Sequence, residues 1–226
     1  MNFVPLNLVG YAQSGLDTEY GAVMASAQFA DVSASDGSIS LGNLTPVAGV
    51  GIDTAYSVEI QILDNGGYTT DADYMWNGAS WDNVMTSSDA SDVTFAAGQG
   101  LWVMNYTGES VGLQSAGRVQ TSDLNIDLDT EYGGVIAGNA FPTAVALSDI
   151  LPVAGVGIDT AYSVEIQILD NGGYTTDADY MWNGASWDNV ITGEPATEVT
   201  FAPGQALWVM NYTGEAVALY IPAPEL

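Results

Sequence analysis

The sequence predicts an all-β protein made of two tandem homologous β-sandwich or β-barrel domains. Three observations lead to this prediction: an internal repeat, apolar and polar residues that alternate with a period of two, and turn sequences at short intervals. Residues 46–84 recur without a change at residues 152–190. We therefore divide the chain into a first repeat, residues 1–115, and a second repeat, residues 116–226.

The strands of the first repeat follow one another along the chain. Residues 56–63 alternate apolar and polar side chains, so we expect a half-buried central strand there. Residues 64–67 contain Asp, Asn and two Gly, which tolerate positive φ, and predict a hairpin that returns through residues 68–76. Residues 77–80 predict a second tight turn, which leads into Trp81. The face expected to point inward carries Tyr56, Val58, Ile60 and Ile62.

The remainder of the repeat continues this pattern. Strands are predicted at residues 93–95, 100–106 and 109–113, and short Gly-containing turns separate them. Only residues 146–151, just before Pro152, indicate a short helical turn. Strands and turns at this spacing are typical of sandwiches and barrels.

The composition is strongly acidic. The chain has 226 residues, with 28 Asp and Glu against 1 Lys or Arg and no His, and a formal net charge of −27. Affinity for nucleic acid comes mostly from basic side chains at phosphates, and Arg118 is the only basic residue, so nucleic acid is excluded as a partner. Because His, Lys and Cys are all missing, the usual bases and nucleophiles are missing too, and we expect no enzyme. A hydrolase that uses two carboxylates is the third hypothesis for the function.

The sequence can form a folded core without disulfides. Hydrophobic residues make up 47% of the chain and include 6 Trp, 12 Tyr and 5 Phe, a composition that disordered chains lack. No apolar run reaches the roughly 18 residues that a spanning helix needs, so we expect no membrane span. The first ten residues lack a basic segment and do not resemble a signal peptide; a mature chain whose leader has been removed is equally possible.

Asp-rich turns form the candidate metal sites. Calcium takes about 6 to 8 oxygen ligands, which Asp pairs and turn carbonyls commonly supply. Bound cations would also relieve the repulsion among the 27 excess negative charges. The alternative is ordinary turn chemistry, in which Asp residues only shape and solvate the loops. The calcium candidates are Asp64, Asp71 and Asp73, with Asp170, Asp177 and Asp179 in the second repeat.

Aromatic residues beside Asn and Asp form a candidate glycan site. Trp81 and Trp187 could stack on sugars in a tandem carbohydrate-binding module, and the alternative is that these side chains fill the core. Asn43, Asn105 and Asn211 each begin a glycosylation sequon, which matters only in a glycosylating host.

The two ends of the chain suggest assembly between copies. The first eight residues occupy the register of a closing strand, so an apolar N-terminal strand could complete the sheet of a neighbouring chain. The last eleven residues form an apolar strand where a third repeat would begin. The alternative is that both ends fold back on their own repeats. The assembly candidates are Phe3, Val4, Leu6 and Leu8, with Leu219 and Ile221 at the other end.

One repeated element supports a broader resemblance. Residues 95–103 and 201–209 share the pattern Phe-Ala-x-Gly-Gln-x-Leu-Trp-Val, which resembles a segment of bacterial secreted β-repeat structural proteins of the filament or surface-layer type. This resemblance implies a secreted or cell-surface structural protein. We therefore expect a subunit that joins copies of itself head to tail by strand exchange, with a tandem carbohydrate-binding module or adhesin as the alternative.

Overall fold

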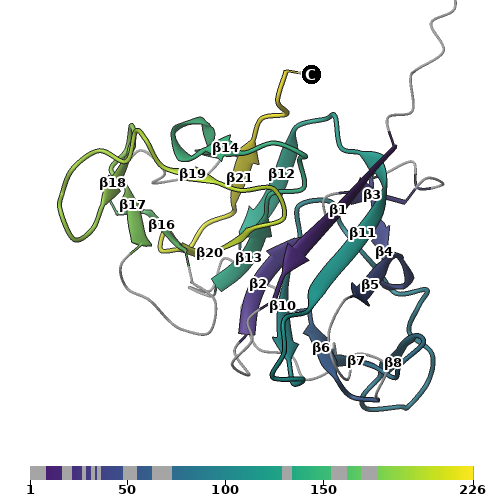
Figure 1. Cartoon of the computed structure of the whole chain (residues 1–226). Helices are drawn as coiled ribbons and strands as arrows, with labels where there is room; N and C mark the ends of the chain where they lie inside the picture. The colour runs from purple at the N-terminus through teal and green to yellow at the C-terminus, as the bar shows by residue number, and fades with distance from the viewer. Residues whose placement is uncertain are drawn as a thin grey trace, which may run out of the picture.

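The computed structural model shows a chain that is nearly all β (Figure 1). It describes residues 9–16, 22–26, 29–31, 34, 37–47, 55–62, 73–128, 134–153, 162–168 and 178–225. The strands form several small antiparallel sheets. No helix in these ranges is long and apolar enough to cross a membrane.

The first repeat contributes a five-stranded sheet and a four-stranded sheet. The five-stranded sheet has the order β2-β10-β6-β7-β8, which places β6 at its centre as the alternating pattern predicts. The four-stranded sheet is built on β11, which pairs with β1, β3 and β5. A two-stranded sheet joins β4 to β9, and the turn η1 (Leu41–Asn43) lies between β4 and β5. The bounds are β1 (Val9–Gly15), β2 (Ala22–Ser26), β3 (Phe29–Ala30), β4 (Ile39–Ser40), β5 (Leu44–Val47), β6 (Val58–Gln61), β7 (Asp73–Trp76), β8 (Trp81–Asn83), β9 (Thr94–Phe95), β10 (Gly100–Asn105) and β11 (Gly112–Val119).

The second repeat follows the same plan. Its five-stranded sheet has the order β13-β20-β16-β17-β18, its three-stranded sheet has the order β12-β21-β15, and β14 pairs with β19. The helical turn predicted before Pro152 is present as η3 (Leu147–Asp149). The bounds are β12 (Leu124–Leu128), β13 (Gly134–Gly138), β14 (Val145–Ala146), β15 (Leu151–Val153), β16 (Val164–Gln167), β17 (Asp179–Trp182), β18 (Trp187–Asn189), β19 (Thr200–Phe201), β20 (Ala206–Asn211) and β21 (Val217–Ile221).

The predicted hairpins are present in both repeats. β6 pairs with β7 so that Glu59 faces Met75, and the next turn brings Trp76 opposite Trp81. The Asn77 amide N–H donates to the Ser80 carbonyl at 2.9 Å, and Asn77 Oδ1 accepts from the amides of Ala79 and Ser80. An Asn side chain that bonds its own turn explains why this sequence reverses the chain here.

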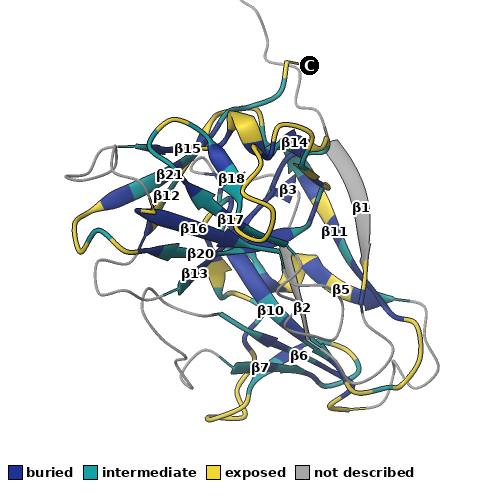
Figure 2. Ribbon diagram, turned by 90° about the vertical axis from the view of Figure 1, so that its left-hand side faces the viewer, coloured by how far each residue is buried: buried dark blue, intermediate teal, exposed yellow. Residues whose placement is uncertain are grey.

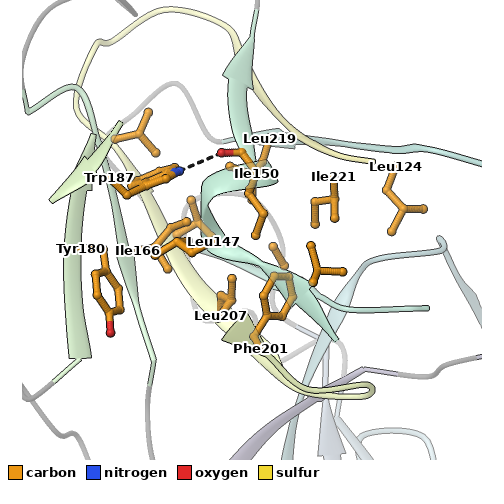
Figure 3. Packing of buried hydrophobic residues seen from close by; sticks show 14 of the residues in the cluster. Leu124, Leu147, Ile150, Ile166, Tyr180, Trp187, Phe201, Leu207, Leu219 and Ile221 are labelled. Carbon is orange, nitrogen blue, oxygen red and sulfur yellow. Dashed lines mark hydrogen bonds between the residues drawn. The ribbon is translucent and has the colours of Figure 1, made fainter. Parts of the chain in front are cut away.

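Two large clusters of buried apolar side chains lie in the two repeats. One draws on residues 16–113 and the other on residues 124–221, and in each case both main sheets contribute side chains. Strands β10 and β16, one from each five-stranded sheet, are mostly buried in Figure 2. Figure 3 shows the second cluster, in which Leu124 and Phe201 come from strands far apart in the sequence.

Two details of the sequence prediction need correction. Tyr56 was expected on the inward face, but its side chain is 66% exposed, because it precedes β6 in a turn with φ of +65°. Val58 and Ile60 are buried as predicted, and Ile62 packs at the edge of the cluster. The boundary expected at Ser115 falls inside β11, which runs on to Val119 beside β1 and β3.

Candidate functional site

The outward face of each five-stranded sheet carries a group of polar side chains that we call the carboxylate–tyrosine cluster. On β6 the apolar residues Val58 and Ile60 point into the core, so the residues between and after them point outward. The antiparallel register sets Gln61 opposite Asp73 and Glu59 opposite Met104. The cluster in the first repeat consists of Glu59, Gln61, Asp73 and Tyr106.

Hydrogen bonds fix the centre of this cluster. The Tyr106 hydroxyl donates to Glu59 Oε2 at 2.6 Å and lies 3.3 Å from the sulfur of Met104. The amide nitrogen of Gln61 donates to Glu59 Oε1 at 2.9 Å. Asp73 Oδ1 is buried and has no hydrogen-bond partner within the described residues. The cluster therefore holds one carboxylate with partners on both oxygens and one with an unused oxygen.

The second repeat reproduces the arrangement. The Tyr212 hydroxyl donates to Glu165 Oε2 at 2.6 Å, and Gln167 donates to Glu165 Oε1 at 2.7 Å. Asp179 Oδ1 is again buried, and the described part of the chain offers it no partner. Because three of these four residues lie in the identical block, the shared sequence accounts for the shared geometry.

Burial and neighbouring charge both act on the acidic groups. Burial, and then the charge of Glu59, raises the pKa of Asp73 above its ordinary value of 3.8. Burial raises the pKa of Tyr106 first, and the hydrogen bond to Glu59 raises it further. Burial and Glu165 raise the pKa of Asp179 in the same way. The Tyr106 hydroxyl is consequently a neutral hydrogen-bond donor at any physiological pH.

The structure places only two of the six calcium candidates. Asp73 and Asp179 begin β7 and β17, and the Oδ1 atom of each has no hydrogen-bond partner among the residues described. No set of three or more acidic side chains able to hold a metal ion occurs among the described residues. The other candidates, Asp64, Asp71, Asp170 and Asp177, lie outside the described residues.

The expected glycan-stacking residues are core residues, which corrects that hypothesis. Trp81 is 0% exposed and Trp187 is 2% exposed. The Trp81 indole N–H donates to the Leu44 carbonyl at 2.8 Å, and the Trp187 indole N–H donates to the Ile150 carbonyl at the same distance (Figure 3). Trp76 packs edge to face against Trp81 with ring centroids 5.4 Å apart. A fully buried indole cannot stack on a sugar.

The C-terminal assembly candidates are also buried within their own chain. Leu219 and Ile221 are both 0% exposed and belong to the core cluster of the second repeat. Their strand, β21, pairs with β12 on one side and β15 on the other, so both of its edges are occupied. This finding corrects the expectation of an unpaired C-terminal strand. The N-terminal candidates Phe3, Val4, Leu6 and Leu8 lie outside the described residues.

The three glycosylation sequons differ sharply in accessibility. Asn105 and Asn211 are both 0% exposed, and each donates from its amide to a backbone carbonyl at 2.8 Å. These two side chains shape turns and are closed to modification in the folded chain. Asn43 is exposed and donates from its amide to Asp31.

Sequence reasoning missed a set of exposed apolar side chains that occurs in both repeats. The large apolar residues exposed at equivalent positions are Tyr56 and Tyr162, Val84 and Val190, Met85 and Ile191, and Tyr106 and Tyr212. The one available signal was the placement of Val84 and Met85 shortly after the turn predicted at residues 77–80, in a stretch that is otherwise mostly polar up to residue 92.

Comparison with protein-family models, with curated proteins and with solved structures finds no match to this chain.

Proposed function

We propose that this chain is an extracellular structural protein, a subunit of a filament or surface lattice formed by copies of itself. In this proposal the two repeats are tandem β-sandwich domains that present the same contact surface twice. The observation that supports it is the set of large apolar side chains exposed at equivalent positions of both repeats. Exposed apolar groups that recur in this way favour a role in protein contacts.

Four members of this set lie in a pair of loops that we call the hairpin tips, formed by Val84 and Met85 in the first repeat and Val190 and Ile191 in the second. Met85 is 67% exposed and Ile191 is 62% exposed. Position 85 lies just beyond the identical block, so its counterpart has changed from Met to Ile and has stayed apolar. The apolar tip is therefore not only a by-product of an identical sequence.

Hydrogen bonds hold each tip in place. Asn83 Oδ1 accepts from the amides of Met85 at 3.0 Å and Thr86 at 2.9 Å, and the Val84 amide donates to the Asp73 carbonyl at 3.0 Å. Asn189 supports Ile191 in the same way at 3.0 Å. A loop that is already ordered loses little conformational entropy when it docks, which favours a contact role.

Charge sets the condition for such assembly. Copies that each carry a net charge of −27 repel one another at low ionic strength. Salt or calcium would screen or bind these charges and allow the apolar tips to dock. We therefore expect assembly to require raised ionic strength or divalent cations.

Composition supports the proposed location. A chain without Cys and Lys, and with a single Arg, has no thiol to oxidise and is poor in sites for cleavage after basic residues, which suits a secreted or cell-surface protein. In the same proposal an N-terminal segment carrying Phe3, Val4, Leu6 and Leu8 donates a strand to the next copy.

A pair of double variants tests the role of the tips. Met85→Asp with Ile191→Asp places two charges at the tips and should abolish the growth of light scattering and of ordered assemblies in electron micrographs. Ala79→Asp with Ala185→Asp is the matched control, because it adds the same charge at exposed positions at the opposite end of each β7–β8 or β17–β18 hairpin. The control should assemble like the native chain. Equal assembly by both variants, or by neither, would contradict the proposed role.

The carboxylate–tyrosine cluster favours a second candidate function, a tandem carbohydrate-binding module. Tyr106 is 39% exposed and stands beside amide and carboxylate groups that can bond sugar hydroxyls. Trp102 lies on the same face, opposite Gln61, so a bound glycan should shift the Trp emission. A saturable shift with added polysaccharide, lost in Tyr106→Ala with Tyr212→Ala, and with no assembly under any condition, would favour this candidate over the first.

A further inference from the structure

The two repeats contact each other through equivalent strands. β2 and β10 of the first repeat lie against β13 and β20 of the second, and these strands occupy the same positions in their sheets. The Gly138 amide N–H donates to the Gly98 carbonyl at 2.7 Å, and Gln99 forms an antiparallel bridge with Ala137. The turn before β10 therefore extends the outer edge of β13 by backbone pairing.

At this contact the two repeats approach each other too closely for position 100, at the start of β10, to carry a side chain. A Cβ atom added to Gly100 would lie 2.1 Å from Ile136 Cγ2 and 3.0 Å from the Ile136 carbonyl carbon. Ile136 is 2% exposed and packs with Ala206, Trp102 and Trp208 in a small cluster that is separate from the two large cores. Gly100 is thus the residue that lets Ile136 seat against the first repeat.

The contact is not symmetric, because the second repeat has Ala206 where the first has Gly100. Consider two second repeats, from two copies, that meet in the same way. Ala206 of one copy would then take the place of Gly100, and its Cβ would lie about 2.1 Å from Ile136 Cγ2 of the other copy, as the Cβ added at Gly100 does. Such a contact cannot form unless the Ile136 side chain or the backbone moves, and that movement would weaken it. The surface of a second repeat therefore fits a first repeat and does not fit another second repeat.

We infer that this selective contact also joins chains, with the first repeat of one chain receiving the second repeat of another copy. This inference rests on the proposed function, in which the partner of the chain is a second copy. Each repeat has its own core, and only four residues, 120–123, connect β11 to β12. An exchanged repeat forms the same contacts as before, so exchange needs no new surface.

Selectivity decides what the exchange produces. The surface of a second repeat binds a first repeat, so two second repeats cannot pair through it. Each chain carries one first-repeat surface and one second-repeat surface. Exchange therefore gives closed rings or open chains of copies. The surface is distinct from residues 1–8, so repeat exchange is compatible with donation of the N-terminal strand.

Engineered cysteines report the exchange directly, because the native chain has 0 Cys. Gln99 and Ala137 lie opposite each other in an antiparallel bridge. The hydrogen bond beside them joins Gly138 to Gly98, so Gln99 and Ala137 form a non-hydrogen-bonded pair of the antiparallel ladder. The Cα atoms of such a pair are about 4.5 Å apart, a separation that a disulfide can bridge. One chain carries Gln99→Cys and the other carries Ala137→Cys; the two are mixed at high concentration and oxidised.

The expected result is a disulfide-linked dimer of the two different variants on non-reducing gels. The matched control mixes Gln205→Cys with Ala137→Cys, since Gln205 caps the same kind of turn as Gln99 but belongs to the same repeat as Ala137. This control should give only background cross-linking. Cross-linking of the test pair at background level while assemblies form would overturn repeat exchange and leave the proposed function standing. Specific cross-linking without large assemblies would support exchange and count against the filament or lattice.

A compensating pair of variants ties the cross-link to the contact at Gly100. Gly100→Ala in the chain that carries Gln99→Cys should lower the cross-link yield about tenfold or more, because overpacking destabilises close contacts. Ile136→Ala in the partner chain removes the clashing methyl groups and should restore most of the yield. An unchanged yield with Gly100→Ala, in a chain that keeps its native Trp fluorescence and melting profile, would overturn the proposed selectivity.

Discussion

The buried indoles of Trp81 and Trp187 offer the sharpest test of the fold. The replacement Trp81→Phe removes the N–H that donates to the Leu44 carbonyl at 2.8 Å. A buried acceptor left without its donor costs about 1–3 kcal/mol. The phenyl ring also leaves part of the indole volume empty, which adds about 1–2 kcal/mol at roughly 0.8 kcal/mol per buried carbon. We expect a total loss of about 3 kcal/mol for the repeat that carries the change.

Thermal and urea unfolding, followed by circular dichroism, measure this loss. If a repeat of roughly 110 residues unfolds as one unit, a change of about 3 kcal/mol lowers its Tm on the order of 10 °C. Trp187→Phe should act equally on the second repeat, because its bond to the Ile150 carbonyl has the same length, 2.8 Å. Tyr106→Phe is the control and should cost about 1 kcal/mol or less, since Tyr106 is partly exposed. Unchanged stability in Trp81→Phe, together with weaker polysaccharide binding, would refute the assignment of this side chain to the core.

Three further predictions concern protons, cations and the N-terminal segment. A carboxyl whose pKa is raised on folding holds its proton more tightly in the folded chain, so the contributions of Asp73 and Asp179 to stability should grow as pH falls through the raised pKa values toward 3.8. The double variant Asp73→Asn with Asp179→Asn should therefore raise Tm at neutral pH and make Tm depend less on pH. A lower Tm would show that the ionised carboxylates stabilise the fold. Excess calcium should raise Tm more than sodium chloride at matched ionic strength, and equal increases would leave no role for specific sites. Deleting residues 1–8 should leave both cores folded, since their described members lie between Leu16 and Ile221, and should stop assembly in light scattering; assembly that persists would contradict strand donation.

Local patterns in the sequence were sufficient for the central strand, its hairpins and β10, whereas the strand predicted at residues 109–113 is β11, which spans Gly112–Val119. The period-two pattern around Val58 and Ile60 placed the central strand β6, and the Asn-Gly turn after Trp76 placed the next hairpin. These features depend on neighbours in the chain, so the local sequence determines them. The helical turn before Pro152 was predicted for the same reason.

Burial depends on how sheets meet, and here sequence reasoning reached its limit. Trp81 and Trp102 both lie in strands, yet Trp81 is fully buried while Trp102 is partly buried and packs in the small cluster between the repeats. Leu219 resembles an assembly residue in sequence but pairs inside its own sheet. The contact of Gly100 with Ile136 joins segments from different repeats, and no local pattern indicates it.

The exposed hairpin tips show a further limit. Met85 follows a strand that ends at Asn83, and only the hydrogen bonds that the Asn83 side chain accepts from the following amides reveal that the chain turns there and directs Met85 to solvent. An apolar residue in such a position reads as core when its turn is not recognised.

Sedimentation velocity of the native chain tests the central claim, that copies of this protein assemble, most directly. Samples spanning a wide range of protein concentration are compared with and without calcium, at one ionic strength, and the largest species are examined by electron microscopy. The account predicts that the sedimentation coefficient rises with concentration and that the large species are filaments or lattices with a regular repeat. A chain that sediments as a monomer at every concentration, with and without calcium, would contradict it.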